Sequence, residues 1–386
     1  MFILEKPYVS EYLIDTLVQE SWDILDNESV EEANIEEGAL ELVSSEDAVN
    51  YYQKQEFPIL YSNSENAINW VLENLPKSNT ASYIKIFKDK ASFRELLTKL
   101  YPDFFYRAEN IDGLDSMDLN EIKFPVVVKP ATGFLSLGVH TINEKAQWND
   151  TITKLNNEMK QFKTMYPETV INDSKFIVEE FIDGEEYAID AYYDRNGEPV
   201  ILNIFEHPRK DESDVKDRIY ITSTEIMIRY MAKFGMMLRD VGKLVNVKNF
   251  PVHVEVRVTN DGRIIPIEFN PMRFAGWCTT DIAYYAWGIN VYEYFQLQKR
   301  PDWNEILMNT ENKIYYFSMV EVPGDIKRGQ ISGFNYEEFL TNYSNILELR
   351  RINPRENPLF AIIFGSTTDK QEIRKILEID VKDYII

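Results

Sequence analysis

Glu255, Glu268 and Asn270 lie on one predicted β-hairpin, and their side chains are of the kinds that hold a cation. Residues 252–276 read VHVEVRVTNDGRIIPIEFNPMRFAG, two alternating runs joined by Asn-Asp-Gly at residues 260–262, which is a strong turn signal. A two-residue loop pairs residue 260 with residue 263, so the alternation places Glu255 opposite Glu268 on one face. Opposed carboxylates repel each other unless a cation lies between them. With the Asn270 amide they suit Mg²⁺ that is shared with nucleotide phosphates.

The hairpin has a competing interpretation, a solvated polar face whose charges splay apart. A slip of one residue in register separates the two carboxylates. His253 lies beside the predicted metal face and is either a residue that orients the metal ligands or a structural histidine. In the second run, Ile265, Ile267 and Phe269 are predicted to share the opposite face.

A second group of polar residues follows a buried strand. Residues 124–140 read FPVVVKPATGFLSLGVH, and their apolar first part predicts a strand that ends at Lys129. Gly133, Ser136 and Gly138 follow in a flexible loop. A positive charge, backbone N–H groups and a hydroxyl are what a polyphosphate needs. A surface hairpin without a ligand is the alternative.

A third group of polar residues surrounds an acidic turn. Residues 175–208 predict three strands, with turn signals at Asp183-Gly184 and Asn196-Gly197. Carboxylates here can accept hydrogen bonds from ribose hydroxyls, and the strand backbone can bind an adenine edge. The alternative is a solvated acidic turn. The carboxylates in question are Glu179, Glu180, Glu185 and Glu186.

Composition limits the class of protein. At 386 residues the chain is long enough for two or three domains, and 44% apolar and 13% aromatic residues indicate a globular protein. The net charge of −23, from 64 acidic and 41 basic residues, argues against binding to nucleic acid or to an anionic membrane surface. No apolar run reaches membrane-spanning length, and the first residues do not resemble a signal peptide. We therefore expect a cytoplasmic protein.

The single cysteine, Cys278, excludes an intramolecular disulfide and metal sites made of thiolate clusters. A buried, inert thiol is favoured over a nucleophile.

The remaining segments predict the elements that position these groups. Residues 1–80 alternate between strand and helix patterns, which favours a parallel sheet, and Ser64 is a predicted helix N-cap. Lys85, Lys88 and Lys90 precede an amphipathic helix, and they are either a solvated surface or phosphate ligands. Neither a G-x-G-x-x-G fingerprint after the first strand nor a P-loop motif is present. Further helices are predicted at residues 144–172, 222–242, 277–297 and 368–377, and further strands at residues 313–320 and 360–364.

In this order, the segments between residues 90 and 276 resemble the ATP-grasp superfamily, and in particular its carboxylate–amine (amino-acid) ligases. Three parts carry the resemblance: the FPVVVKP strand with its glycine loop, VEEFIDGEE, and HVEV…DG…IEFNP. The resemblance implies a mixed α/β (α+β) fold in which the nucleotide lies between two antiparallel sheets, preceded by a parallel α/β domain. The implied domains are residues 1–85 (N-terminal α/β), 86–190 (lid-bearing), 191–324 (metal-binding) and 325–386 (C-terminal α/β).

The resemblance also implies roles for individual residues. Lys129 and Lys90 contact the phosphates, with Lys85 and Lys88 as alternatives to Lys90. The lid loop covers the phosphates, residues 179–182 bind adenine and Glu186 binds ribose. The implied ATP-binding residues are Lys90, Lys129, Gly133, Ser136, Gly138, Glu179, Glu180, Phe181, Ile182 and Glu186. The implied ligands for Mg²⁺, with Mn²⁺ as an alternative ion, are Glu255, Glu268 and Asn270.

One motif departs from the family pattern. Where the family often has Asn-Pro-Arg, this chain has Asn270-Pro271-Met272-Arg273, so the arginine comes one residue later. Arg273 either steadies the transferred phosphoryl group or binds the carboxylate of the substrate. With Lys129 it is the implied catalytic pair.

The implied function is an ATP- and Mg-dependent carboxylate–amine ligase. It would act through an acyl phosphate on amino acids or similar small acids, and would release ADP and phosphate. One alternative is an ATP-grasp enzyme with a different acceptor, and another is a nucleotide-binding regulatory protein without turnover. The expected partners are ATP, a small acid and a small amine. We expect no binding to nucleic acid or membrane, and a homodimer is one possible assembly.

Overall fold

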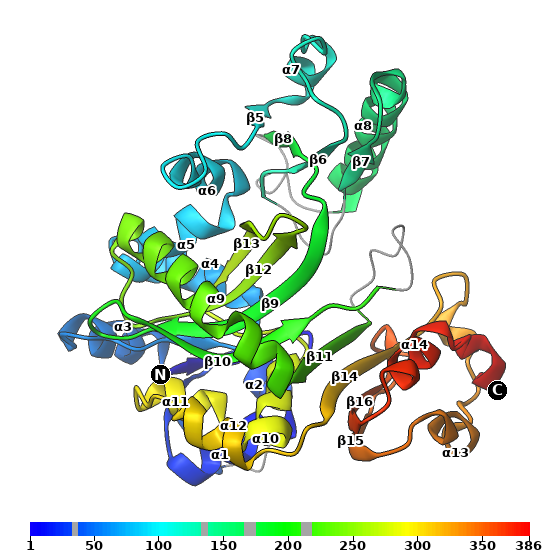
Figure 1. The fold of residues 1–386 in the computed structure, drawn as a ribbon. Helices are drawn as coiled ribbons and strands as arrows, with labels where there is room; N and C mark the ends of the chain where they lie inside the picture. The colour runs from blue at the N-terminus through cyan, green and yellow to red at the C-terminus, as the bar shows by residue number, and fades with distance from the viewer. Residues whose placement is uncertain (33–37, 133–137, 166–174, 210–217) are drawn as a thin grey trace.

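The computed structural model describes residues 1–32, 38–132, 138–165, 175–209 and 218–386, and side chains within these ranges except for residues 159–165. The strands of the described ranges form a 4-stranded sheet of order β3-β2-β1-β4, an 8-stranded sheet of order β13-β12-β9-β10-β11-β14-β16-β15 and a 4-stranded sheet of order β5-β8-β6-β7 (Figure 1).

The N-terminal sheet is parallel, as predicted, because its strands alternate with helices. Its last strand, β4, begins at Tyr61, at the end of the apolar run of residues 57–61. Ser64 caps a short helix, η1 (Glu65–Ala67), by accepting from the Asn66 amide. The strands are β1 (Phe2–Ile3), β2 (Asp23–Leu25), β3 (Glu41–Val43) and β4 (Tyr61–Ser62).

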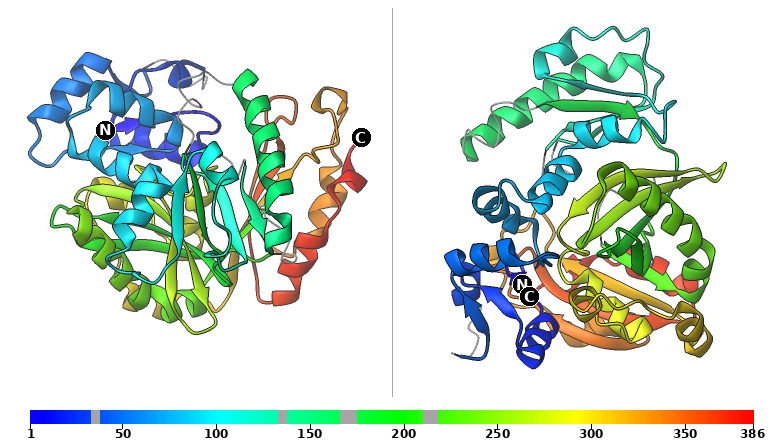
Figure 2. Two further views of the ribbon diagram at one scale, coloured as in Figure 1. Left: turned by 90° about the horizontal axis from the view of Figure 1, so that it is seen from above. Right: turned by 90° about the vertical axis from the view of Figure 1, so that its left-hand side faces the viewer.

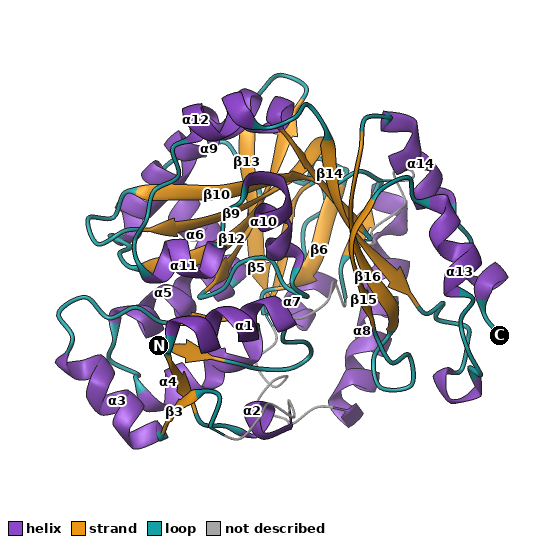
Figure 3. Ribbon diagram, turned by 90° about the horizontal axis from the view of Figure 1, so that it is seen from below, coloured by secondary structure: helices purple, strands orange, loops and turns teal. Residues whose placement is uncertain are grey.

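The 8-stranded sheet is antiparallel throughout and carries the large core. Its C-terminal strands extend it away from the hairpin, toward α13 and α14 (Figure 3). The methionine-rich stripe of α9 (Thr224–Val245) packs on it as core. The strands are β9 (Gly184–Tyr193), β10 (Pro199–Glu206), β11 (Ile219–Ser223), β12 (Phe250–Thr259), β13 (Ile264–Pro271), β14 (Ile314–Glu321), β15 (Ile346–Arg351) and β16 (Leu359–Thr367).

A smaller antiparallel sheet stands over the β12–β13 hairpin, as Figure 1 and the right-hand view of Figure 2 both show. Its own core joins its strands to α7 (Ile111–Asp115) and α8 (Trp148–Met165). Two antiparallel sheets therefore face the region between them, as the family resemblance implied. The strands are β5 (Tyr106–Glu109), β6 (Val126–Pro130), β7 (His140–Ile142) and β8 (Phe176–Glu180).

Helices α5 (Asn79–Lys88) and α6 (Lys90–Leu97) connect the N-terminal sheet to the small sheet. Asp89 lies between them and caps α6 through the Ser92 amide at 2.6 Å, which fixes Lys90 at the first helical position. The other α-helices of the described ranges are α1 (Glu11–Glu20), α2 (Glu28–Glu32), α3 (Ser45–Lys54), α4 (Ile68–Asn74), α10 (Ile282–Trp287), α11 (Val291–Gln296), α12 (Trp303–Asn309), α13 (Tyr336–Phe339) and α14 (Lys370–Glu378).

The β12–β13 hairpin pairs Glu255 with Glu268, as predicted, but reaches this pairing by another path. The Thr259 amide donates to the Arg263 carbonyl at 2.9 Å, so the loop has three residues instead of two. It ends on Gly262, whose φ of 84° is a left-handed conformation that glycine adopts without strain.

A β-bulge in β13 then restores the predicted pairing. The register shifts between Pro266 and Glu268, so one extra residue of β13 faces β12. The bulge also places Ile265 opposite Arg257, on the face that carries the carboxylates. The prediction that Ile265 shares a face with Phe269 is therefore wrong, because simple alternation does not continue through a bulge.

Gly184 begins β9 where the chain passes close to the end of β12, and this packing makes a testable prediction. A Cβ at Gly184 would lie 2.4 Å from the Val258 carbonyl oxygen, which is backbone and cannot rotate away. Gly184→Ala should lower the free energy of unfolding by about 2 kcal/mol, as overpacking does. Urea unfolding measures the change. Gly324→Ala is the control, because nothing lies within 4 Å of its Cβ, and equal unfolding of the two variants would contradict the prediction.

Candidate active site

The predicted metal ligands lie together on one face of the hairpin. Glu255 pairs with Glu268, and His253 pairs with Asn270 in the neighbouring row. The Asn270 amide nitrogen lies 3.4 Å from Glu255 Oε1. On the other side, Lys90 Nζ donates to Glu268 Oε1 at 2.9 Å. The first turn of α6 thus brings a cation to the repelling carboxylates.

The charge of Lys90 changes the protonation of this row. Burial opposes ionisation of Glu268, but Lys90, its hydrogen bond and the charge of Lys88 together outweigh burial and lower the pKa of Glu268. Glu255 and Glu268 also help to raise the pKa of Arg273, against the effect of burial and together with Glu65. Glu268 is therefore held as a carboxylate, which is the form that a hard cation requires.

The donor set fits a divalent cation that also has other ligands. Among the described residues, no three His, Cys, Asp or Glu side chains gather where they could hold a metal ion by themselves. Two carboxylates and one amide give an incomplete shell for Mg²⁺, which in proteins often binds to one or two carboxylates, water and substrate phosphates. Glu255, Glu268 and Asn270 suit that arrangement.

Lys129 lies in a buried ion cluster at the end of β6. Its Nζ is 2.5 Å from Glu179 Oε1, and Arg94 Nε donates to Glu179 Oε2 at 2.7 Å. Burial lowers the pKa of Lys129, and Arg94 and Lys90 add to this, while Glu179 opposes it. Both oxygens of Glu179 contact cations, so its carboxylate holds Lys129 and Arg94 in place at the end of the small sheet.

The segment after β8 has the backbone groups that an adenine edge needs. The Phe181 amide donates to the Pro125 carbonyl at 3.1 Å, and the Ile182 carbonyl accepts from Arg257 at 2.6 Å. Within the described residues, the Phe181 carbonyl and the Ile182 amide make no hydrogen bond. They are an acceptor and a donor on adjacent residues. Glu180 accepts from the Phe105 amide at 3.1 Å and so fixes the edge of the small sheet.

Two arginines and a histidine surround Glu186, the predicted ribose ligand. Arg257 donates to Glu186 Oε2 at 3.1 and 3.2 Å, Arg209 also contacts that oxygen, and His207 Nδ1 is 3.5 Å from Oε1. Burial alone would raise the pKa of Glu186, but His207, Arg209 and Arg257 lower it to about 2.

Met272, the extra residue in the motif, determines where the Arg273 side chain lies. Met272 has a left-handed backbone, with φ of 66°, and its side chain is buried. Its carbonyl accepts from the Ser62 amide at 2.9 Å, which ties the loop to the N-terminal sheet. Arg273 Nη2 then lies 2.9 Å from Glu65 Oε1, and Lys88 contacts the other Glu65 oxygen. The extra residue thus directs Arg273 onto a carboxylate of η1.

Three predicted residues belong to the lid loop. Gly133 and Ser136 lie outside the described residues. Gly138 has a φ of 73°, and a Cβ there would lie 3.2 Å from Pro130, so glycine suits the end of the loop. Of the three candidate lysines, Lys88 and Lys90 lie at the site and Lys85 is exposed.

Sequence reasoning missed several residues that contact the predicted ones. Arg94 lies one helical turn after Lys90, so helical spacing could have found it. Arg257 lies two residues after Glu255 on the same strand face, which also was a signal. No sequence signal pointed to Glu65, because only the packing of the N-terminal region against the hairpin brings it to Arg273.

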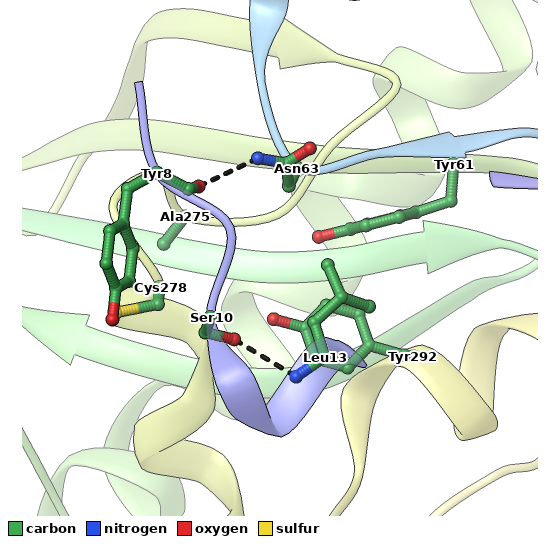
Figure 4. Close-up of a pocket in the computed structure, with 8 residues that line it drawn as sticks. All are labelled: Tyr8, Ser10, Leu13, Tyr61, Asn63, Ala275, Cys278 and Tyr292. Carbon is green, nitrogen blue, oxygen red and sulfur yellow. Dashed lines mark hydrogen bonds between the residues drawn. The ribbon is translucent and has the colours of Figure 1, made fainter. Parts of the chain in front are cut away.

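The aromatic residues after the hairpin divide between core and surface. Phe274 and Trp287 are buried, and Trp287 donates to Asn203 Oδ1 at 2.9 Å. Tyr284 is 48% exposed. Figure 4 shows a cavity beside this segment, between the N-terminal region and Ala275, of about 10 Å³. That volume holds about one water, so it is not a formed substrate pocket.

Cys278 also lines this cavity. It is buried, as the sequence favoured, and burial raises the pKa of its thiol.

Comparison with known proteins identifies the fold. Residues 122–281 match the family model described as ATP-grasp domain. Over 170 residues the chain is 25% identical to alanine–anticapsin ligase of Bacillus subtilis (strain 168). This alignment covers 41% of this chain and 35% of that ligase. The match therefore spans about a third of that relative's length.

Solved structures align over nearly the whole chain. An L-amino acid ligase from Bacillus licheniformis has a TM-score of 0.66 at 15% identity, covering 100% of this chain and 98% of that one. The biotin carboxylase domain dimer of Hydrogenobacter thermophilus 2-oxoglutarate carboxylase, in complex with MgADP, ADP and bicarbonate, has a TM-score of 0.62 at 12% identity, covering 95% and 86%. This chain has the ATP-grasp fold, and residues 122–281 are the part that resembles the ATP-grasp domain model. In the described ranges, no helix is long and apolar enough to span a membrane.

The Glu179 cluster makes a prediction about stability and pH. Burial opposes ionisation of Glu179, but Arg94 and Lys129 lower its pKa from 4.5 to about 2. Its contribution to folding is therefore complete above pH 4.5 and is lost as the pH falls through 2. Glu179→Gln should cost on the order of 3 kcal/mol near neutral pH, because two buried cations lose their carboxylate.

Urea unfolding at pH 7, 4 and 3 tests this prediction, and the difference from wild type should shrink below pH 4.5. Glu121→Gln is the control, since Glu121 is 63% exposed in its pair with Arg107, and it should cost less than about 1 kcal/mol. A penalty for Glu179→Gln that stayed the same at all three pH values would contradict the assignment.

Proposed function

We propose that this protein is an ATP-dependent carboxylate–amine ligase that forms an acyl phosphate and releases ADP and phosphate. The observation that carries the proposal is the Glu255–Glu268 pair, flanked by Asn270 and by Lys90. Such a row is costly in a sheet unless a cation completes it. The similarity to amino acid ligases favours a small amino acid or a related acid as substrate.

ATP would lie between the small sheet and the hairpin. The carbonyl of Phe181 and the amide of Ile182, which make no hydrogen bond to any described residue, suit the adenine edge. Glu186 suits the ribose hydroxyls, because Arg209, Arg257 and the hydrogen bond from His207 keep it ionised as a hydrogen-bond acceptor. Lys129 and Lys90 suit the phosphates, with Gly133, Ser136 and Gly138 as the proposed lid.

Glu255, Glu268 and Asn270 would hold Mg²⁺, or Mn²⁺ in its place. When bound, the ion would neutralise phosphate charge and orient the phosphates for in-line transfer. The chain's own contribution is positioning. Lys90 donates to Glu268 at 2.9 Å and can exchange this carboxylate for a phosphate oxygen, since both are anionic acceptors.

Arg273 would stabilise the phosphoryl group as it moves to the substrate carboxylate. The carboxylates of Glu255 and Glu268 contribute to its raised pKa, so it lies within their field, although its direct partner is Glu65. A guanidinium fixed in this way keeps its charge and needs little reorganisation during transfer. The amine would then attack the acyl phosphate, forming the C–N bond and releasing phosphate.

A panel of acids and amines tests the reaction. With Mg-ATP, ADP release should require both an acid and an amine, and the mass of the product should equal the two substrates less one water. ADP release with an acid and a non-amine acceptor would favour the alternative enzyme. Tight ATP binding with no turnover on the whole panel would contradict a ligase and would favour a regulatory protein.

Glu268→Gln tests the metal assignment. The substitution keeps the size of the side chain and removes the charge opposite Glu255, so turnover should fall by at least about 100-fold and Mg-ATP should bind more weakly. Calorimetry measures binding, and circular dichroism checks the fold. Asp261→Asn, at the exposed tip of the same hairpin, should leave both unchanged. Wild-type activity in Glu268→Gln would refute this role.

A further inference from the structure

Asp190 is a buried carboxylate that neither the metal site nor the nucleotide site uses. It lies on β9 directly opposite His253 of β12, which in turn lies opposite Asn270 of β13. The next row along the same face is Ala188, Glu255 and Glu268. Asp190 and His253 therefore stand beside the proposed metal row, on the same side of the sheet.

Asp190 makes two short contacts through one oxygen. Asp190 Oδ1 lies 2.8 Å from His253 Nδ1 and accepts from the Ala275 amide, also at 2.8 Å. Its side chain is fully buried, and Oδ2 has no hydrogen-bond partner among the described residues. Burying a carboxylate with one oxygen unsatisfied is unfavourable, so core packing alone does not account for it.

His253 connects this carboxylate to the metal row. With Nδ1 on Asp190, its Nε2 lies 4.0 Å from Glu255 Oε1. The ring is buried, and Phe205 packs against it edge-on with centroids 6.4 Å apart. The contact with Asp190 and this packing together hold the ring between Asp190 and Glu255.

Ala275 connects the same carboxylate to the loop that carries Arg273. Three non-glycine residues of this loop have left-handed backbones: Met272, Trp277 and Cys278, with φ of 66°, 50° and 56°. Such residues persist only when their surroundings hold them. The bond from the Ala275 amide to Asp190 is one such restraint, two residues after Arg273.

We infer that Asp190 and His253 are positioning residues that couple the metal carboxylate Glu255 to the loop of Arg273. Asp190 fixes the His253 ring beside Glu255 and also holds the Ala275 amide. The position of Glu255 relative to Arg273 is therefore fixed. The inference rests on the proposed function, since it assigns these two residues to the same site. The competing explanation is a buried pair that only stabilises the fold.

Mn²⁺ binding in the presence of a non-hydrolysable ATP analogue separates the two explanations, and electron paramagnetic resonance measures it without turnover. Asp190→Asn, which keeps the volume, and His253→Phe, which keeps the ring shape, should each weaken Mn²⁺ binding about 10- to 100-fold. His253→Asn keeps an N–H donor for Asp190 and should bind Mn²⁺ at least about threefold more tightly than His253→Phe.

Thr222→Val is the matched control, because the Thr222 hydroxyl donates to Asn203 Oδ1 at 2.9 Å in an equally buried pair away from the hairpin. It should lower the melting temperature and leave Mn²⁺ affinity at the wild-type value. Unchanged Mn²⁺ affinity in both Asp190→Asn and His253→Phe would overturn the inference while leaving the proposed function intact. If the wild-type protein itself binds no Mn²⁺ with the analogue, the proposed function fails, and the inference fails with it.

Discussion

The repulsion between Glu255 and Glu268 is the constraint on which the rest of the site depends. The register of β12 and β13 places the two carboxylates opposite each other, with side chains only 28% and 20% exposed. Water screens such a pair poorly, so positive charge must come from elsewhere. Lys90 supplies it from α6, and Arg273 supplies it from the loop after the hairpin. The negative charge of the hairpin therefore explains why α6 and the loop after the hairpin both place a cationic side chain beside it.

The same alternation of charge continues through the site. Glu179 lies between Lys129 and Arg94, Glu65 lies between Lys88 and Arg273, and Glu186 has its own cationic neighbours. Buried ion pairs contribute little net stability, because desolvation offsets their attraction. Here the ion pairs fix the positions of the cationic side chains, because each one is held where it can bond to its carboxylate.

The sequence predicted these features only where local patterns decide them. Alternation and the Asn-Asp-Gly turn predicted the carboxylate pairing correctly. The predicted loop was one residue too short and the bulge was not predicted, and these two errors cancel in the register. The parallel N-terminal sheet and the strand before Lys129 followed from apolar runs. Glu65 and the Asp190–His253 contact depend on how distant strands pack, which no local pattern encodes. Met272 looked like a defect in the motif, yet its left-handed backbone is what directs Arg273 onto Glu65.

We propose that a divalent cation bound with ATP sits between Glu255 and Glu268. A crystal structure with Mn²⁺ and a non-hydrolysable ATP analogue tests it directly through the anomalous signal of manganese. We expect a peak within ligand distance, about 2.0–2.6 Å, of oxygens from both carboxylates. Lys90 Nζ should then lie on a phosphate instead of on Glu268. A peak elsewhere, with Lys90 still paired to Glu268, would rule out this position for the cation.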